Sequence, residues 1–120
     1  MIEELISKLQ KETEYCYYFG GTARIEDCVV YQYYSTSDDR VKQEYRLELH
    51  IIVKGIDTDA VKRIEQIKAA IHDCVLTAPD HVLTGNIRKV TQNGGGQLTD
   101  ENTRTTHQIL YYDILYRKGR

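Results

Sequence analysis

The amino-acid sequence predicts an α+β domain in which two helices cover one face of a single antiparallel sheet of about four strands. Two segments repeat apolar residues at helical spacing, and four other segments alternate apolar and polar residues with the period of a strand. The length of 120 residues suits one domain spanning residues 1–120. The expected element order is α-β-β-β-α-β-β, which allows both helices to lie on the same face.

The first predicted helix covers residues 2–12. Its apolar residues recur three and four positions apart and form one stripe: Ile2, Leu5, Ile6 and Leu9. An aromatic segment, residues 15–19, follows and ends at a Gly-Gly break, so it is either a short strand or an extended linker.

Two alternating segments then predict a hairpin. Residues 23–34 are rich in β-branched and aromatic residues and carry apolar side chains on both faces in their second half, which favours cover on both sides. The second strand alternates most cleanly and has its expected core face at Tyr45, Leu47, Leu49, Ile51 and Val53. The polar residues 35–40 between these segments predict a turn.

A longer helix is expected after Gly55, with Asp57 or Thr58 as its cap. Its apolar stripe consists of Ala60, Val61, Ile64, Ile67, Ala70, Ile71 and Cys74. The single proline, Pro79, discourages a longer helix. Residues 82–92 and 105–116 predict a second hairpin, whose flexible loop starts at the Asn93-Gly-Gly-Gly96 run and continues to Thr103.

Composition and charge exclude several classes of protein. With 16 basic and 18 acidic residues the net charge is −2, which disfavours a module that reads a nucleic-acid groove. Apolar runs are far shorter than the roughly 20 residues that a membrane helix needs, and we expect no signal peptide. The three cysteines, Cys16, Cys28 and Cys74, contain no C-x-x-C pair, so free thiols in a reducing compartment are expected.

No pattern in the sequence predicts catalysis. The histidines, His50, His72, His81 and His107, are scattered, and surface or capping roles are expected for them. The glycine run 94–96 lacks the lysine of a phosphate-binding loop, and no nucleophile motif is present. We therefore predict a protein that is not an enzyme, with no catalytic residue, no cofactor and no metal ligand.

Tyrosine is the unusual residue of this chain, with ten copies against one Phe and no Trp. Several tyrosines are adjacent on predicted strands, and neighbours on a strand point to opposite faces, so one of each pair lies outside the core. Tyrosine is enriched at protein interfaces because it combines contact area with a polar tip. The candidate subunit-interface residues are Tyr31, Tyr33, Tyr34, Tyr112 and Tyr116. The alternative is that these tyrosines pack against one another across strands on a partly solvent-exposed face of the sheet.

Residues 94–117, GGGQLTDENTRTTHQILYYDILYR, combine a Gly-rich turn, an acidic loop and an apolar final strand. This segment resembles the small minor capsid and tail-completion proteins of long-tailed bacteriophages and prophages. A short N-terminal helix, the strand YRLELHIIVKG, the helix DTDAVKRIEQIKAAI and a closing hairpin are also similar in order to the tail terminator fold.

The resemblance implies a virion protein of the tail or neck, made in the cytoplasm of a bacterial host. Its implied partners are copies of itself in a ring, usually a hexamer, the tail tube protein and a neck or connector protein. DNA passes through such a ring without sequence-specific binding. The candidate docking loops lie within residues 35–40 and 93–104 and include Asp38, Asp39, Arg40, Gly94, Gly95, Gly96 and Arg104. A connector stopper and a small dimeric ligand-binding α+β module are the alternatives.

Overall fold

The order of helices and strands in the computed structural model confirms the predicted α-β-β-β-α-β-β sequence of elements. The structure describes residues 2–13, 15–20, 28–76 and 87–117. Its elements are α1 (Ile2–Thr13), β1 (Tyr17–Phe19), β2 (Cys28–Asp38), β3 (Lys42–Lys54), α2 (Thr58–Leu76), β4 (Ile87–Asp100) and β5 (Thr105–Arg117). The predicted strand starts at Ala23 and Val82, together with Pro79 and His81, lie outside the described residues.

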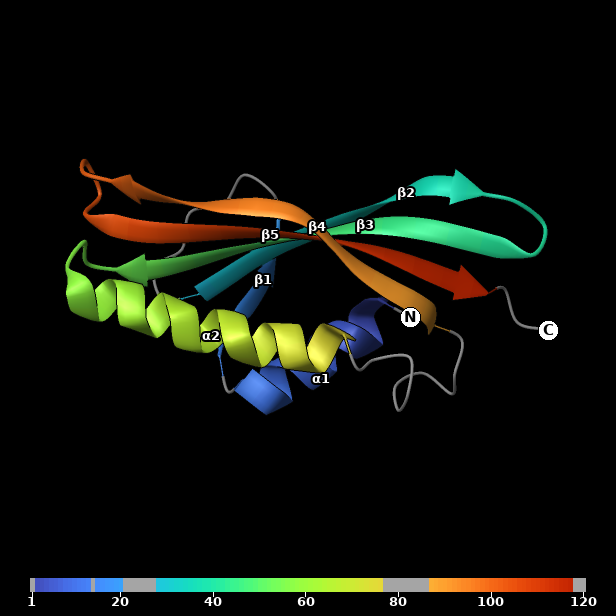
Figure 1. Ribbon diagram of the computed structural model, residues 1–120, viewed down its shortest axis with the longest axis horizontal. Coiled ribbons are helices and arrows are strands. Elements are labelled where there is room, and N and C mark those ends of the chain that lie inside the picture. The colour runs from blue at the N-terminus through green and yellow to red at the C-terminus, as the bar shows by residue number, and fades with distance from the viewer. Residues whose placement is uncertain (1, 14, 21–27, 77–86, 118–120) are drawn as a thin grey trace.

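The strands form one five-stranded sheet in the order β1-β2-β3-β5-β4 (Figure 1). The four long strands are antiparallel neighbours, as predicted. The expectation of about four strands is corrected by β1, which adds a fifth strand parallel to β2. Backbone hydrogen bonds hold it there, because the Val29 N–H donates to the Cys16 carbonyl at 2.7 Å and the Gly20 N–H donates to the Tyr31 carbonyl at 3.0 Å.

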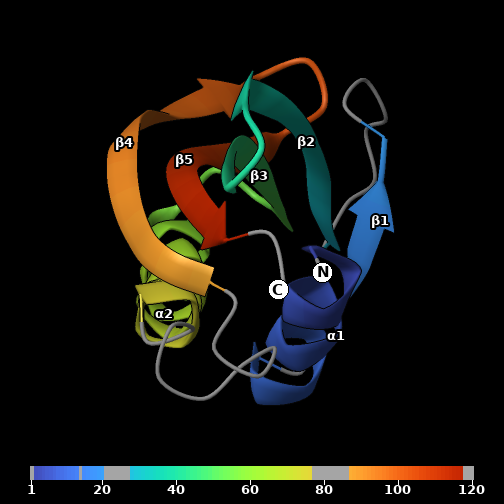
Figure 2. The same ribbon diagram turned by 90° about the vertical axis from the view of Figure 1, so that its right-hand side faces the viewer.

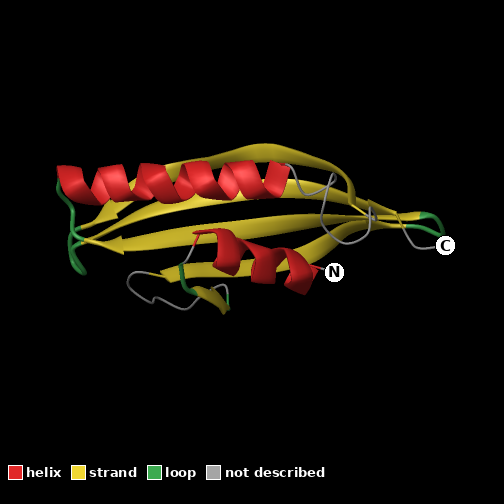
Figure 3. Cartoon of the chain, turned by 90° about the horizontal axis from the view of Figure 1, so that it is seen from below, coloured by secondary structure: helices red, strands yellow, loops and turns green. Residues whose placement is uncertain are grey.

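Both helices cover one face of this sheet (Figure 3). Asp57 is the cap of α2, since its Oδ1 accepts a hydrogen bond from the Ala60 N–H at 3.0 Å. The core joins α1, α2 and the inner face of β3 and β5 through fully buried side chains, among them Leu5, Leu9, Leu47, Leu49, Ile51, Ile64, Ile71, Leu110, Tyr112 and Ile114. Each large apolar side chain buried in this way contributes about 1.5–3 kcal/mol. Val61 was expected in the α2 stripe but is 38% exposed.

The domain is elongated, with extents of 48 × 23 × 20 Å. Viewed along its length, the sheet curves over the two helices (Figure 2). The β2–β3 turn, residues 39–41, and the β4–β5 turn, residues 101–104, lie at opposite ends of the long axis (Figure 1). The β2–β3 hairpin extends beyond α2, and residues 34–38 of β2 are exposed.

Both predicted docking loops are shorter than expected because the strands continue into them. Gly94, Gly95 and Gly96 lie inside β4, where the register shifts between Gln92 and Gly95. Gly95 has a φ of 142°, and a Cβ there would lie 2.2 Å from the Ile109 carbonyl oxygen. Glycine is therefore needed for a close backbone approach at a bulge, and the prediction of a flexible tip at these three residues was wrong.

The first predicted loop is corrected in the same way. The strand β2 continues to Asp38, so residues 35–38 are paired with β3 and only residues 39–41 form the turn. Oδ1 of Asp39 accepts hydrogen bonds from the N–H groups of Val41 and Lys42, both at 2.8 Å. This Asp-centred turn allows a tight reversal, and the Ser and Thr residues before it remain in the strand.

Candidate assembly surface

Two long stretches of strand edge have no neighbour among the described residues. β4 is the last strand of the sheet and pairs only with β5, although it has 14 residues and most of them are exposed. On the other side, β1 covers β2 only from Val29 to Tyr31. Residues 32–38 of β2 therefore have no described strand on their outer side. Open edges of this kind present unpaired backbone donors and acceptors to another chain.

The sheet register places these two open edges at the same level along the strands. Ile87 at the start of β4 pairs with Tyr116, which pairs with Gln43, which in turn pairs with Asp38 at the end of β2. Three antiparallel steps separate β2 from β4, so the two edge strands run in opposite directions. Their charges also differ in sign, because exposed Arg88 and Lys89 begin β4 whereas Asp38 ends β2.

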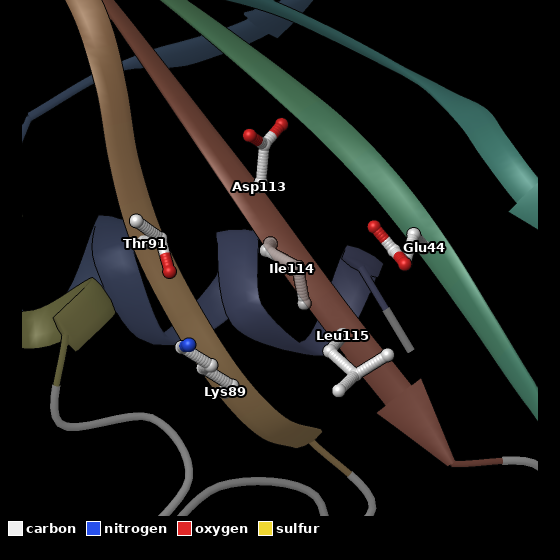
Figure 4. Close-up of a pocket in the computed structure, with 6 residues that line it drawn as sticks. All are labelled: Glu44, Lys89, Thr91, Asp113, Ile114 and Leu115. Carbon is white, nitrogen blue, oxygen red and sulfur yellow. The ribbon is translucent and has the colours of Figure 1, made fainter.

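The outer face of the sheet, opposite the helices, carries a polar network. Nε of Arg46 donates to Oδ1 of Asp113 at 3.1 Å, and Nδ2 of Asn93 donates to Oδ2 of the same carboxylate at 2.8 Å. The hydrogen bond and the charge of Asp113 raise the pKa of Arg46. Beside this network is an open hollow of about 310 Å³, lined by Glu44, Lys89, Thr91, Asp113, Ile114 and Leu115 (Figure 4).

Tyr34 is the most exposed of the five predicted interface tyrosines. Its side chain is 47% exposed, and the residue lies opposite Arg46 in the β2–β3 register. Tyr31, Tyr33 and Tyr116 are partly buried and pack against the core. The interface role of these four residues stays a prediction.

Tyr33 belongs to an aromatic cluster at the α1 side of the sheet. Phe19 meets Tyr31 and Tyr33 edge-on, with ring centroids 5.3 and 5.8 Å apart, and Tyr33 meets Tyr45 at 6.0 Å. The Tyr33 hydroxyl donates to the Glu3 carboxylate. That hydrogen bond lowers the pKa of Glu3. It is also the main reason why the pKa of Tyr33 is raised to about 12.

The placement of Tyr112 at a subunit interface was wrong. Its side chain is completely buried in the core and its hydroxyl is hydrogen bonded to Nδ1 of His72. Burial raises the pKa of Tyr112 and lowers the pKa of His72. The residue of this pair that lies on the outer face is Tyr111, because Tyr112 shares its parity with buried Leu110 and Ile114.

The remaining predicted docking residues lie at the two ends of the domain. Asp38 at the end of β2 and Asp39 and Arg40 in the β2–β3 turn are exposed. Arg104 closes the β4–β5 turn with a φ of 55°, and its carbonyl accepts a hydrogen bond from the Gly55 N–H at 2.7 Å. The structure therefore places Asp38, Asp39 and Arg40 at the opposite end of the domain from Arg104, so these residues do not form one common site.

The beginning of β5 holds a buried polar cluster that the sequence did not predict. Nδ1 of His107 and Nε2 of His50 share a hydrogen bond at 2.8 Å, while Nε2 of His107 and the Thr105 hydroxyl share one at 2.7 Å. His107 is only 3% exposed, so its predicted surface role was wrong. The sequence carries no signal for this burial, because the polar run Thr105 to Gln108 by itself favours exposure.

Within the described ranges, no group of three or more His, Cys, Asp or Glu side chains is arranged to hold a metal ion. Among the helices in the described part of the chain, none combines the length and the apolar character needed to cross a membrane.

Comparison with known proteins shows a likeness in fold to solved structures. No family model matches the sequence, and no curated protein matches it. A chain from the solved structure of the virion of a native gene transfer agent particle has the same fold, with a TM-score of 0.66. The match covers 97% of this chain and 93% of that chain at 11% sequence identity. The protein therefore has an α+β fold that also occurs in a component of a virion.

Proposed function

We propose that the protein is a structural component of a phage-like virion that forms a ring at the head–tail joint. In this role it ends the tail tube and docks the tube to the neck. The observation that carries the proposal is the shared fold with the gene transfer agent virion chain, which extends over nearly the whole of both chains. A connector stopper at the same joint is the neighbouring possibility.

The two open edges supply a route to the ring. A rotation that keeps the strands level would set residues 87–92 of one copy antiparallel to residues 32–38 of the next. The contact is head-to-tail, because two different patches meet, and it forms a ring when its rotation closes after a whole number of copies. Main-chain hydrogen bonds would provide affinity. Arg88 and Lys89 facing Asp38 would favour this register over alternatives.

The elongated shape suits a ring that contacts a different partner on each side. The β2–β3 turn and the β4–β5 turn lie at opposite ends of the domain, so one can reach the tail tube protein while the other reaches the neck or connector protein. A net charge of −2 gives little attraction for DNA phosphates, which suits passage of DNA without sequence-specific binding.

The oligomeric state tests the ring directly. We expect light scattering to detect a closed ring, with six copies as the first expectation, either for the protein alone or after mixing with the tail tube protein. A chain that remains monomeric under both conditions contradicts the proposal. A stable dimer that is stabilised by a metabolite in a thermal-shift screen supports the ligand-binding alternative instead.

A charge swap tests the proposed contact between edges. Lys89→Glu and Asp38→Lys should each weaken assembly, whereas the double variant should restore it in part, because opposite charges then face each other again. Lys62→Glu makes the same charge change on an exposed position of α2 and serves as the control. If the double variant assembles no better than either single one, the two edges do not meet.

A further inference from the structure

We propose that Cys16 and Cys28 form a reversible disulfide that fastens β1 to β2. Both are free thiols in this structure, with their Sγ atoms 2.8 Å apart. The Cys28 thiol also lies 3.1 Å from the Cys16 carbonyl oxygen. Since a disulfide bond is about 2.05 Å long, closing it requires the sulfur atoms to approach by less than about 1 Å.

The backbone geometry of the parallel pair suits this bond. Tyr17 pairs with Val29, so Cys16 and Cys28 occupy the preceding step of the same ladder. Neighbouring strands lie about 4.8 Å apart, which is within the Cα separations of about 4.4–6.8 Å found across disulfides. The hydrogen bond from the Val29 N–H to the Cys16 carbonyl fixes the two chains at this step.

The two sulfurs differ in access, which sets the order of the chemistry. Cys16 is exposed and meets an oxidant first, whereas Cys28 is 1% exposed. Hydrogen peroxide oxidises the Cys16 thiol to a sulfenic acid and is itself reduced to water. The Cys28 sulfur then attacks the Cys16 sulfur, the Cys28 thiol proton passes to the departing hydroxyl, and that hydroxyl leaves as a second water. Two thiols and one hydrogen peroxide therefore give one disulfide and two waters.

The Cys28 thiol is protected from oxidants that react with thiolates. Burial, together with the hydrogen bond to Cys16, raises the pKa of Cys28 to about 12. It therefore remains a thiol until the neighbouring sulfur becomes electrophilic, so the reaction is directed to this pair. Cys74 is buried in α2 and belongs to the core cluster, so it serves as the internal reference for a cysteine that stays reduced.

The bond would strengthen the attachment of the shortest strand of the sheet. β1 has only three residues, and closing the chain between positions 16 and 28 would restrict its detachment. If the protein is a virion component, as proposed above, it assembles in a reducing cytoplasm and later meets an oxidising exterior. The disulfide would then form after release of the particle. The cysteine chemistry itself does not depend on that function.

The test is to treat the folded, full-length protein with a small excess of hydrogen peroxide, alkylate it and digest it with trypsin without reduction. Cleavage after Arg24 separates the two cysteines in sequence. We therefore expect a joined peptide pair that lacks two hydrogens, with Cys74 alkylated after unfolding. The melting temperature should rise by several degrees and return to its original value with dithiothreitol.

Cys16→Ser should abolish this rise, and Cys74→Ser should retain it. The proposal is overturned if Cys16 instead links two copies, if it proceeds to a sulfinic acid while Cys28 remains a thiol, or if both cysteines stay reduced. These readouts are made on the isolated protein, so failure of ring assembly leaves them unaffected.

Discussion

The two faces of the sheet are built from the same strands, yet they differ sharply in composition. On the helix-covered face, Leu47 and Leu49 of β3 are completely buried in the core. On the outer face, the neighbouring residue Arg46 belongs to the polar network with Asp113, and Glu48 accepts a hydrogen bond from Gln32. Because side chains alternate along a strand, one residue step separates a folding surface from a surface available for assembly. Tyr111 and Tyr112 are the clearest case.

The largest expected effect breaks the inner face. Tyr112→Ala should lower the free energy of unfolding by about 3–5 kcal/mol, because it leaves a large cavity among buried side chains of the core. Urea denaturation followed by circular dichroism measures the change.

The adjacent residue provides the matched control. Tyr111→Ala should cost less than half as much, since Tyr111 is only partly buried on the outer face. Tyr112→Phe keeps the ring but removes the hydrogen bond to His72, at a cost of about 1 kcal/mol. Equal losses for the two alanine variants would show that the faces are not distinct.

The bulge in β4 decides which of its residues lie on each face. Before the bulge Lys89 and Thr91 are opposite outer-face residues of β5, and after it Leu98 takes that position opposite His107. Gly95→Val should destabilise the fold by about 2–4 kcal/mol, because its Cβ would meet the Ile109 carbonyl oxygen at 2.2 Å.

Gly96→Ala is the control for this prediction. No atom lies within 4 Å of a Cβ added at Gly96, so its stability should change by less than about 1 kcal/mol. A similar loss at both glycines would indicate that flexibility of the run, rather than close approach at one position, is what the fold requires.

The sequence was sufficient to predict the elements and most of the core. Alternation in residues 45–53 identified the buried face of β3, and helical spacing identified most of the buried stripe of α2. The bulge was not predictable, since a glycine run is common in mobile loops and its close approach to β5 depends on tertiary pairing. The parallel attachment of β1 also depends on contacts far apart in sequence.

The candidate site was less predictable for a related reason. Both Tyr111 and Tyr112 fit an outward position, because a strand pattern alone does not say which of its faces receives the helices. Tyr34 was placed correctly on the exposed side, since β2 becomes polar beyond it. The common level of the two open edges follows only from the strand register.

A smaller effect is expected on the outer face. Asp113→Asn removes the charge that pairs with Arg46, so the melting temperature should fall slightly and the difference from the wild type should shrink as salt is added. Glu65→Gln, which removes an acidic charge from the exposed side of α2, is the control and should have little effect. A decrease that is independent of salt would assign the role of Asp113 to its hydrogen bond with Asn93 instead.

The smallest effect concerns Tyr33 and Glu3, which join the inner face to α1. The pKa of Tyr33 is raised from about 10 to about 12, mainly by its hydrogen bond to Glu3, so the folded state favours the protonated phenol. The stabilisation is therefore fully present below about pH 10 and is lost as the pH rises through about 12. The pKa of Glu3 is lowered, so on the acid side the stabilisation is present above its ordinary pKa of 4.5 and is lost as the pH falls below it.

Tyr33→Phe should be less stable than the wild type at neutral pH, and the gap between the two proteins should close between about pH 10 and pH 12. Thermal unfolding measured across that range gives the gap directly. Tyr18→Phe removes an exposed hydroxyl from β1 and supplies the reference for general alkaline effects. If the gap stays constant from pH 9 to pH 12, the phenol–carboxylate hydrogen bond does not connect α1 to the sheet in solution, and the aromatic contacts of Phe19 and Tyr45 alone hold Tyr33 in place.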